Sequence, residues 1–84
     1  PNQPAFMDTQ AMLMAEHGDT AGATALLRKA LEIAPQAAAV RLNLATVLIL
    51  SGRKDEARVE LDALAKLGEK FPEHAEVKRL QGTL

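Results

Sequence analysis

The chain has 84 residues, of which 48% are apolar, with 10 Lys and Arg against 11 Asp and Glu and no Cys. This length allows one small domain with a modest core, and the lack of Cys excludes a disulfide framework and a thiolate metal site. The formal charge of -1 offers no basic surface to a phosphate backbone, so nucleic-acid binding is not expected.

The longest apolar stretch and the two ends of the sequence indicate whether the chain enters a membrane and whether it is part of a longer polypeptide. Residues 44–50 form an apolar run broken only by Thr46, far short of the roughly 20 residues of a spanning helix, so membrane insertion is not expected. The chain starts at Pro1 instead of Met and carries no leader-like segment. We therefore expect a piece of a longer polypeptide whose natural end lies near Leu84.

Apolar periodicity and turn residues predict five helices and no strand. Gly18 and Gly52 each follow an amphipathic stretch and predict tight turns between antiparallel helices. Pro35 and Pro72 follow helical stretches and separate the hairpins. The predicted helices span about residues 4–17, 20–33, 37–51, 53–67 and 73–82.

Two of these helices have distinctive surfaces. The helix at about 37–51 is apolar around nearly its whole circumference, which predicts that it is buried or binds a partner. The charged run from Arg53 to Asp62, which includes Glu60, alternates in sign and predicts a solvated face.

An internal repeat appears when the sequence is aligned with itself so that Pro1 falls on Pro35. We call this shift the repeat offset. The residues that it matches are mostly small or apolar. The further pairs are Ala11 and Ala45, Leu13 and Val47, Met14 and Leu48, Gly18 and Gly52, Ala23 and Ala57, and Leu27 and Leu61.

The segment GDTAGATALLRKALEIAP, residues 18–35, resembles the second half of a tetratricopeptide repeat. The resemblance implies an all-α fold, a right-handed α-solenoid of antiparallel helix hairpins, with small residues at the helix crossings. It divides the chain into the tail of a preceding repeat (1–3), a first repeat (4–37), a second repeat (38–71) and a capping helix (72–84).

The sequence departs from the family pattern in three places. Met7 and Met14, then Arg41 and Leu48, stand where aromatic residues are often found, and Glu69 stands where the second repeat would end in Pro. Asn43 matches a residue that chaperone-tail binders use to clamp a carboxylate, but Asp8 stands where their leading Lys would be. The resemblance therefore does not extend to a carboxylate clamp.

The resemblance implies a protein-interaction scaffold in which the first helix of each repeat lines a concave, largely apolar groove for a peptide or helix of a partner protein. The last helix covering part of this groove is the alternative. The expected groove residues are Asp8, Met12, Glu16, Leu42, Asn43, Thr46 and Ile49, with Ala15 and Leu50 beside them.

A structural role is the alternative function: a terminal cap of a longer solenoid that binds no ligand of its own. Solenoid units bury their apolar faces against neighbours, so the side of the first helix that bears Phe6 and Leu13 is expected to pack on a preceding repeat. Left bare, this side is expected to act as a self-association face that gives a homo-oligomer.

Catalysis, a cofactor and a metal are not expected. His17 precedes Gly18, where an imidazole satisfies carbonyl groups at a helix end, and His74 lies in a polar run without ligand spacing. Gly18 and Gly22 lack the strand and the GK[ST] of a phosphate loop.

Segments near both ends, PAFMDTQ and LAKLGEKFPEHAEV, are similar to the closing repeats of bacterial proteins of exosortase-type surface sorting and exopolysaccharide export. This likeness implies a periplasmic or envelope-associated parent protein. The residues themselves leave the cytoplasm and the envelope both open.

Overall fold

The computed structural model describes residues 3–84, with only the backbone at Glu69. Within them the chain forms five α-helices, one short 3-10 helix and no strand, which confirms the all-α prediction. Pro1 and Asn2, most of the expected tail, lie outside the described residues. The helices are α1 (Pro4–Glu16), α2 (Thr20–Ile33), α3 (Ala38–Leu50), α4 (Lys54–Ala65), η1 (Gly68–Lys70) and α5 (His74–Gln81).

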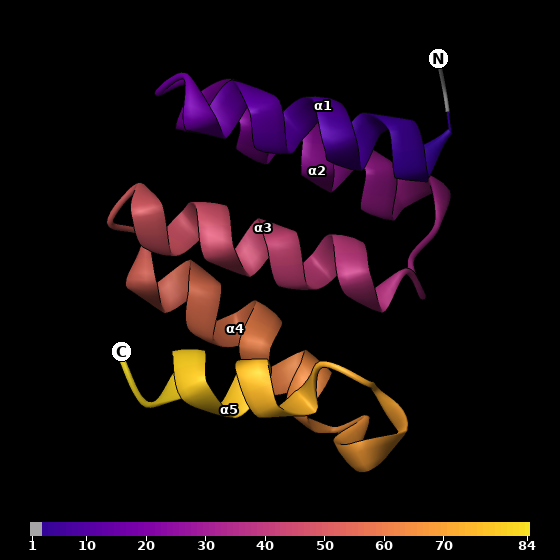
Figure 1. Ribbon diagram of the computed structural model, residues 1–84, viewed down its shortest axis with the longest axis vertical. Coiled ribbons are helices and arrows are strands. Elements are labelled where there is room, and N and C mark those ends of the chain that lie inside the picture. Colours follow the sequence, from indigo (N-terminus) through magenta and orange to yellow (C-terminus); the bar gives the residue numbers. More distant parts are fainter. Residues whose placement is uncertain (1–2) are drawn as a thin grey trace.

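The helices are arranged in two layers. Figure 1 shows α1, α3 and α5 all running in the same direction, with α2 behind α1 and α4 between α3 and α5 in this view. Helices α1 and α2 form one antiparallel hairpin and α3 and α4 form the next, so the architecture is an all-α helical-repeat solenoid.

Two glycines make the turns inside the hairpins. Gly18 has φ of 90° and Gly52 has φ of 81°, a left-handed conformation that L-residues rarely adopt. At the first turn, the N–H of Asp19 donates to the carbonyl oxygen of Met14 over 2.9 Å, and at the second the N–H of Arg53 donates to that of Leu48 over 2.8 Å. Both turns thus end a helix with the same glycine-dependent motif, at positions that the repeat offset pairs.

Asp19 also caps the start of α2, because its Oδ1 accepts a hydrogen bond from the N–H of Gly22 over 2.9 Å. Replacing Asp19 by Ala is expected to lower the free energy of unfolding by about 1 kcal/mol, since one N-terminal N–H loses its partner. Urea denaturation followed by circular dichroism measures the change. Arg53→Ala is the matched control, because Arg53 occupies the same position before α4 and makes no such cap; a loss as large as that of Asp19→Ala would contradict the capping role.

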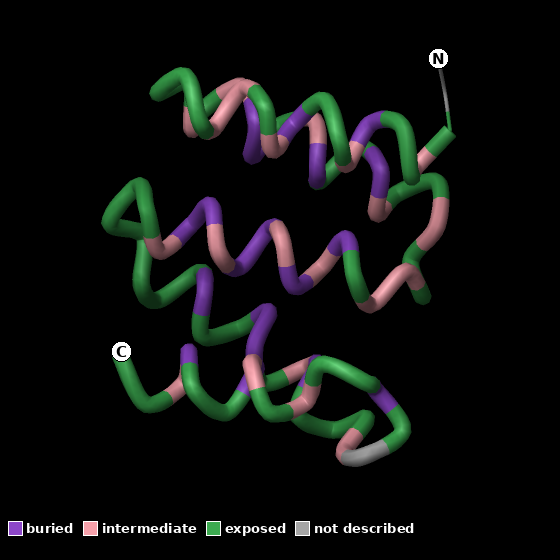
Figure 2. The backbone as a smooth tube through the Cα atoms, viewed as in Figure 1, coloured by how far each residue is buried: buried purple, intermediate pink, exposed green. Residues whose placement is uncertain are grey.

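The core consists of two clusters that meet at α3, whose buried positions alternate along its length in Figure 2. One cluster joins α1, α2 and α3 and includes Ala57 of α4. The other joins α3, α4 and α5, and Ile49 packs against both. Alanines at the helix crossings are fully buried, as the repeat pattern predicts, so the helices approach closely there. They are Ala11, Ala23, Ala45 and Ala57.

The last helix, α5, buries Val77 and Leu80 and exposes Lys78 and Arg79. On its surface, Arg79 donates hydrogen bonds of 2.7 Å to both carboxylate oxygens of Glu76. This pairing lowers the pKa of the Glu76 carboxyl and raises the pKa of the Arg79 guanidinium. Helix α5 is therefore amphipathic, with its apolar side on the second cluster.

Candidate functional site

The first helices of the two hairpins are joined by a polar contact between two predicted groove residues. The amide Nδ2 of Asn43 on α3 donates to both carboxylate oxygens of Asp8 on α1, over 2.8 and 3.0 Å. Each residue was expected in the groove, and the structure brings them together. We call the surface around this contact the α1–α3 face: Asp8, Met12, Glu16, Asn43, Thr46, Ile49 and Leu50.

The α1–α3 face is partly open to solvent. Leu50 is 65% exposed, Glu16 is exposed, and the remaining members are half-buried. Met12 and Ile49 pack against the first core cluster. The hydroxyl of Thr46 donates to the carbonyl oxygen of Leu42 over 3.0 Å. The face therefore offers apolar groups and two carboxylates at one surface.

Leu42 does not belong to this face, and its expected place in the groove is wrong. It is only 9% exposed and lies in the second core cluster with Val77 and Leu80 of α5. The reason is the position of α5, which packs against α4 and completes the second cluster, in which this side of α3 is buried. The last helix thus covers one predicted groove residue and leaves Asn43 and Thr46 half-buried.

The charge on the α1–α3 face is negative. Helix α1 contains no Lys or Arg, and the single Arg of α3, Arg41, pairs with Glu60 of α4 over 2.7 Å. Asp8 and Glu16 are two turns apart on α1, a spacing of roughly 12 Å at 1.5 Å per residue. Their negative charges favour a positively charged ligand at this surface.

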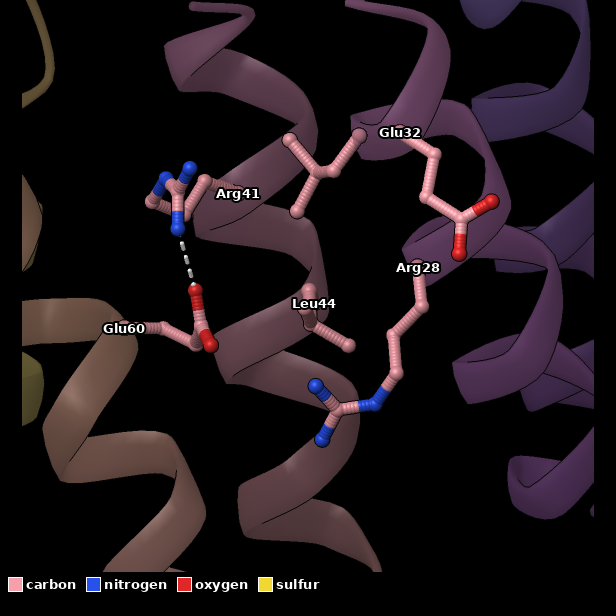
Figure 3. Close-up of a pocket in the computed structure, with 6 residues that line it drawn as sticks. Arg28, Glu32, Arg41, Leu44 and Glu60 are labelled. Carbon is pink, nitrogen blue, oxygen red and sulfur yellow. Dashed lines mark hydrogen bonds and ion pairs between the residues drawn. The ribbon is translucent and has the colours of Figure 1, made fainter. Parts of the chain in front are cut away.

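A separate pocket of about 320 Å³ lies between α2, α3 and α4. Figure 3 shows Glu60 and Arg41 joined to each other on one side of it, with Arg28 and Glu32 on the side of α2. Arg28 is itself bound to Glu56 over 3.0 Å. Because its charged groups largely satisfy one another, this pocket is a weaker candidate for ligand binding than the α1–α3 face.

Glu60 corrects the prediction that the charged run of α4 is solvated throughout. It is 9% exposed and pairs with Arg41, which also donates to the carbonyl oxygen of Pro35 over 3.1 Å. Glu60 lies on the side of α4 that faces α3, so it needs a buried partner. The remainder of the run is exposed except for Ala57 and Leu61.

The predicted self-association residues lie on α1, at the end of the molecule away from α5 (Figure 1). Phe6 is 58% exposed and Leu13 is 52% exposed. They lie two turns of the helix apart and so share one side of α1. The structure thus leaves two large apolar groups in solvent where the sequence predicts an interaction.

The histidines have local surroundings. The Nδ1–H of His17 donates to the carbonyl oxygen of Leu13 over 2.8 Å, which confirms its predicted role at the end of α1. His74 starts α5 and is half-buried. Among residues 3–84 no group of three or more potential metal ligands comes together, and every helix is too short or too polar to cross a membrane.

Comparison with known proteins adds one finding. Residues 14–84, from the end of α1 to the end of the chain, match the family model described as tetratricopeptide repeat. No curated protein and no solved structure matches the chain. The matched residues include both glycine turns and all of α2, α3, α4 and α5. The chain therefore belongs to the tetratricopeptide repeat family.

Proposed function

We propose that the α1–α3 face binds a segment of a partner protein, so that the chain acts as an interaction scaffold. Tetratricopeptide repeats generally mediate protein–protein interactions and are generally non-catalytic. The observation that carries the proposal is the bond between Asp8 and Asn43, because it ties α1 and α3 into one surface that spans both hairpins. Leu50, 65% exposed, provides apolar area at its edge.

The charge of this face supports a partner segment that carries basic side chains. Asp8 and Glu16 bear negative charges at positions about 12 Å apart along the axis of α1, and the amide of Asn43 already donates to Asp8. A ligand carboxylate would be repelled by Asp8, whereas two Lys or Arg side chains at this separation would be attracted. Met12 lies between Asp8 and Glu16 on α1 and is half-buried, which favours an apolar side chain between the basic ones.

Three labelled peptides of equal length test the proposal: one with lysines flanking a central leucine, one with glutamates and one with serines in their place. We expect the lysine peptide to bind at least about tenfold more tightly than the glutamate peptide at low salt. Thr46→Lys is expected to weaken its binding by at least about tenfold, because it adds a cation one helical turn after Asn43, whose amide binds Asp8. Fluorescence anisotropy gives the dissociation constants.

Two controls separate the surface from its charge. Val59→Lys adds the same cation at a 66% exposed position on α4, outside the face, and should leave binding within about twofold. The double variant Asp8→Asn with Glu16→Gln should remove the preference for lysine, because it removes both charges and keeps side chains of nearly the same shape. If the wild type and Thr46→Lys bind every peptide equally, the α1–α3 face is not the binding surface.

A capping role is the second candidate, and the amphipathic α5 favours it. Its buried Val77 and Leu80 close the second cluster, while Lys78 and Arg79 face solvent. Terminal units of solenoids need such a polar outer surface. A chain that only caps would bind none of the three peptides, and this outcome would favour the second candidate over the first.

The likeness to exosortase-associated and exopolysaccharide-associated bacterial repeat proteins stays a prediction. An envelope or periplasmic location belongs with it as a proposal, and the cytoplasm is its alternative. Detection of the parent protein in separated cell fractions of the source organism distinguishes these locations.

A further inference from the structure

The side chains of the α1–α3 face accept hydrogen bonds but offer no free donor. Among its seven residues only Asn43 and Thr46 carry side-chain N–H or O–H groups. The amide Nδ2 of Asn43 donates to both carboxylate oxygens of Asp8, and the hydroxyl of Thr46 donates to the carbonyl oxygen of Leu42. What remains for a ligand is acceptor capacity, chiefly on the carboxylates of Asp8 and Glu16.

The backbone of this face supplies no donor either. All seven residues lie in α1 or α3, at the fifth position of the helix or later, so their N–H groups donate to carbonyl groups one turn earlier. A partner that excludes water from this face must therefore bring donors, and its own acceptors must be paired within the partner.

This requirement separates a helical partner from an extended one. Each residue of an extended segment carries a backbone C=O group without a partner in the segment, and those turned toward the α1–α3 face would find no donor there. An α-helix pairs its C=O groups internally and presents side chains. Lys and Arg side chains are donors without acceptors, so on a helix they satisfy both the charge and the hydrogen bonding of this face.

The spacing of the face fits side chains on one side of a helix. Asp8, Met12 and Glu16 follow one another at four-residue steps on α1, about 6 Å apart along its axis. A partner helix that lies along α1 repeats this step with its residues i, i+4 and i+8. The fold itself uses such a contact, since α3 packs on the first hairpin through a buried row that includes Val40 and Val47.

We infer that the partner segment binds the α1–α3 face as an α-helix that carries Lys or Arg at i and i+8 and an apolar residue at i+4. The two basic side chains lie at the carboxylates of Asp8 and Glu16, and the apolar side chain lies at Met12. This inference rests on the proposed function of the face, and it specifies the conformation and the spacing of the partner segment.

Two alanine-rich peptides of identical composition test the conformation. One has lysine, leucine and lysine at i, i+4 and i+8, and the other has them at i, i+2 and i+4, the spacing on one side of an extended chain. In fluorescence anisotropy at low salt, we expect the first peptide to bind at least about tenfold more tightly. Proline in place of an alanine next to its leucine should weaken binding by at least about tenfold, because proline breaks the helix.

A charge exchange tests the register. Glu16 is exposed at the end of α1, where a lysine is favourable to the helix, so Glu16→Lys should fold normally. It should weaken the helical peptide by at least about tenfold. Of two versions of that peptide with glutamate in place of the lysine at i or at i+8, Glu16→Lys should bind one at least about tenfold more tightly than the wild type does. Val59→Lys, at a 66% exposed position on α4, is the matched control and should improve neither.

The outcomes separate this inference from the proposed function. If the peptide with extended spacing binds as tightly as the helical one, or if proline leaves binding unchanged, the helical partner is wrong while the proposed function stands. If Glu16→Lys improves neither glutamate version, or both equally, the spacing of i and i+8 along α1 is wrong. If no lysine peptide binds at all, the proposed function fails and the inference fails with it.

Discussion

Replacing Leu48 by alanine is expected to lower the free energy of unfolding by about 3 kcal/mol. Leu48 is 0% exposed and lies in the cluster that joins α3 to the first hairpin. The substitution removes buried methyl groups and leaves a cavity that rigid neighbouring helices fill only in part. A chain of this size has a total stability of roughly 4 to 13 kcal/mol, so the substitution removes a large share of it.

Leu50→Ala is the control for this prediction, because it makes the same chemical change in the same helix. Leu50 is 65% exposed and should change stability by less than about 0.5 kcal/mol. Guanidinium denaturation of both variants, followed by circular dichroism, gives the two free energies of unfolding. They can be compared directly when the dependence on denaturant concentration is the same in both variants. Equal losses at Leu48 and Leu50 would mean that α3 packs by a side other than the one described.

The elements that the sequence predicted well depend on local signals. A left-handed glycine after an amphipathic stretch specifies a helix end without reference to the remainder of the fold, and Gly18 and Gly52 both have this conformation. Asp19 begins α2 for an equally local reason, since its carboxylate caps the N–H of Gly22. Helix boundaries therefore differ from the predicted ones by a few residues at most.

Leu42 shows where local signals fail. Its place in an apolar helix did not reveal which neighbour covers it, because the answer depends on α5, which begins only at His74. The late arrival of Pro72 signalled an altered end of the second repeat but not the side on which α5 would pack. Similarly, Asp8 and Asn43 were predicted separately, and the bond between them required the relative position of α1 and α3.

The sequence contained a sign that Glu60 is buried, although the alternating charges around it suggested a solvated helix face. The repeat offset pairs Arg41 with Met7 and Glu60 with Leu26. Two apolar positions of the first repeat are thus replaced together by opposite charges in the second. Such a paired replacement indicates an ion pair between the two helices, and the structure has it at 2.7 Å.

Arg41→Met is expected to destabilise the fold by about 3 kcal/mol, because it leaves the carboxylate of Glu60 without its partner in a buried position. The side chain of Glu60 is 11% exposed, so water solvates it poorly. Glu60→Leu should cost less, since the side chain of Arg41 is 28% exposed and keeps its hydrogen bond to the carbonyl oxygen of Pro35. Denaturant unfolding at neutral pH measures both losses.

The double variant Arg41→Met with Glu60→Leu should recover most of the lost stability. Its free energy of unfolding should be no more than about 1 kcal/mol below that of the wild type. It places in the second repeat the pair that the first repeat already has: Met7, 2% exposed, and Leu26, packed against the first cluster. The double variant should therefore lose at least about 2 kcal/mol less stability than the sum of the two single losses. Losses that simply add would contradict this, because they would show that each charged group is stabilised by something other than its partner.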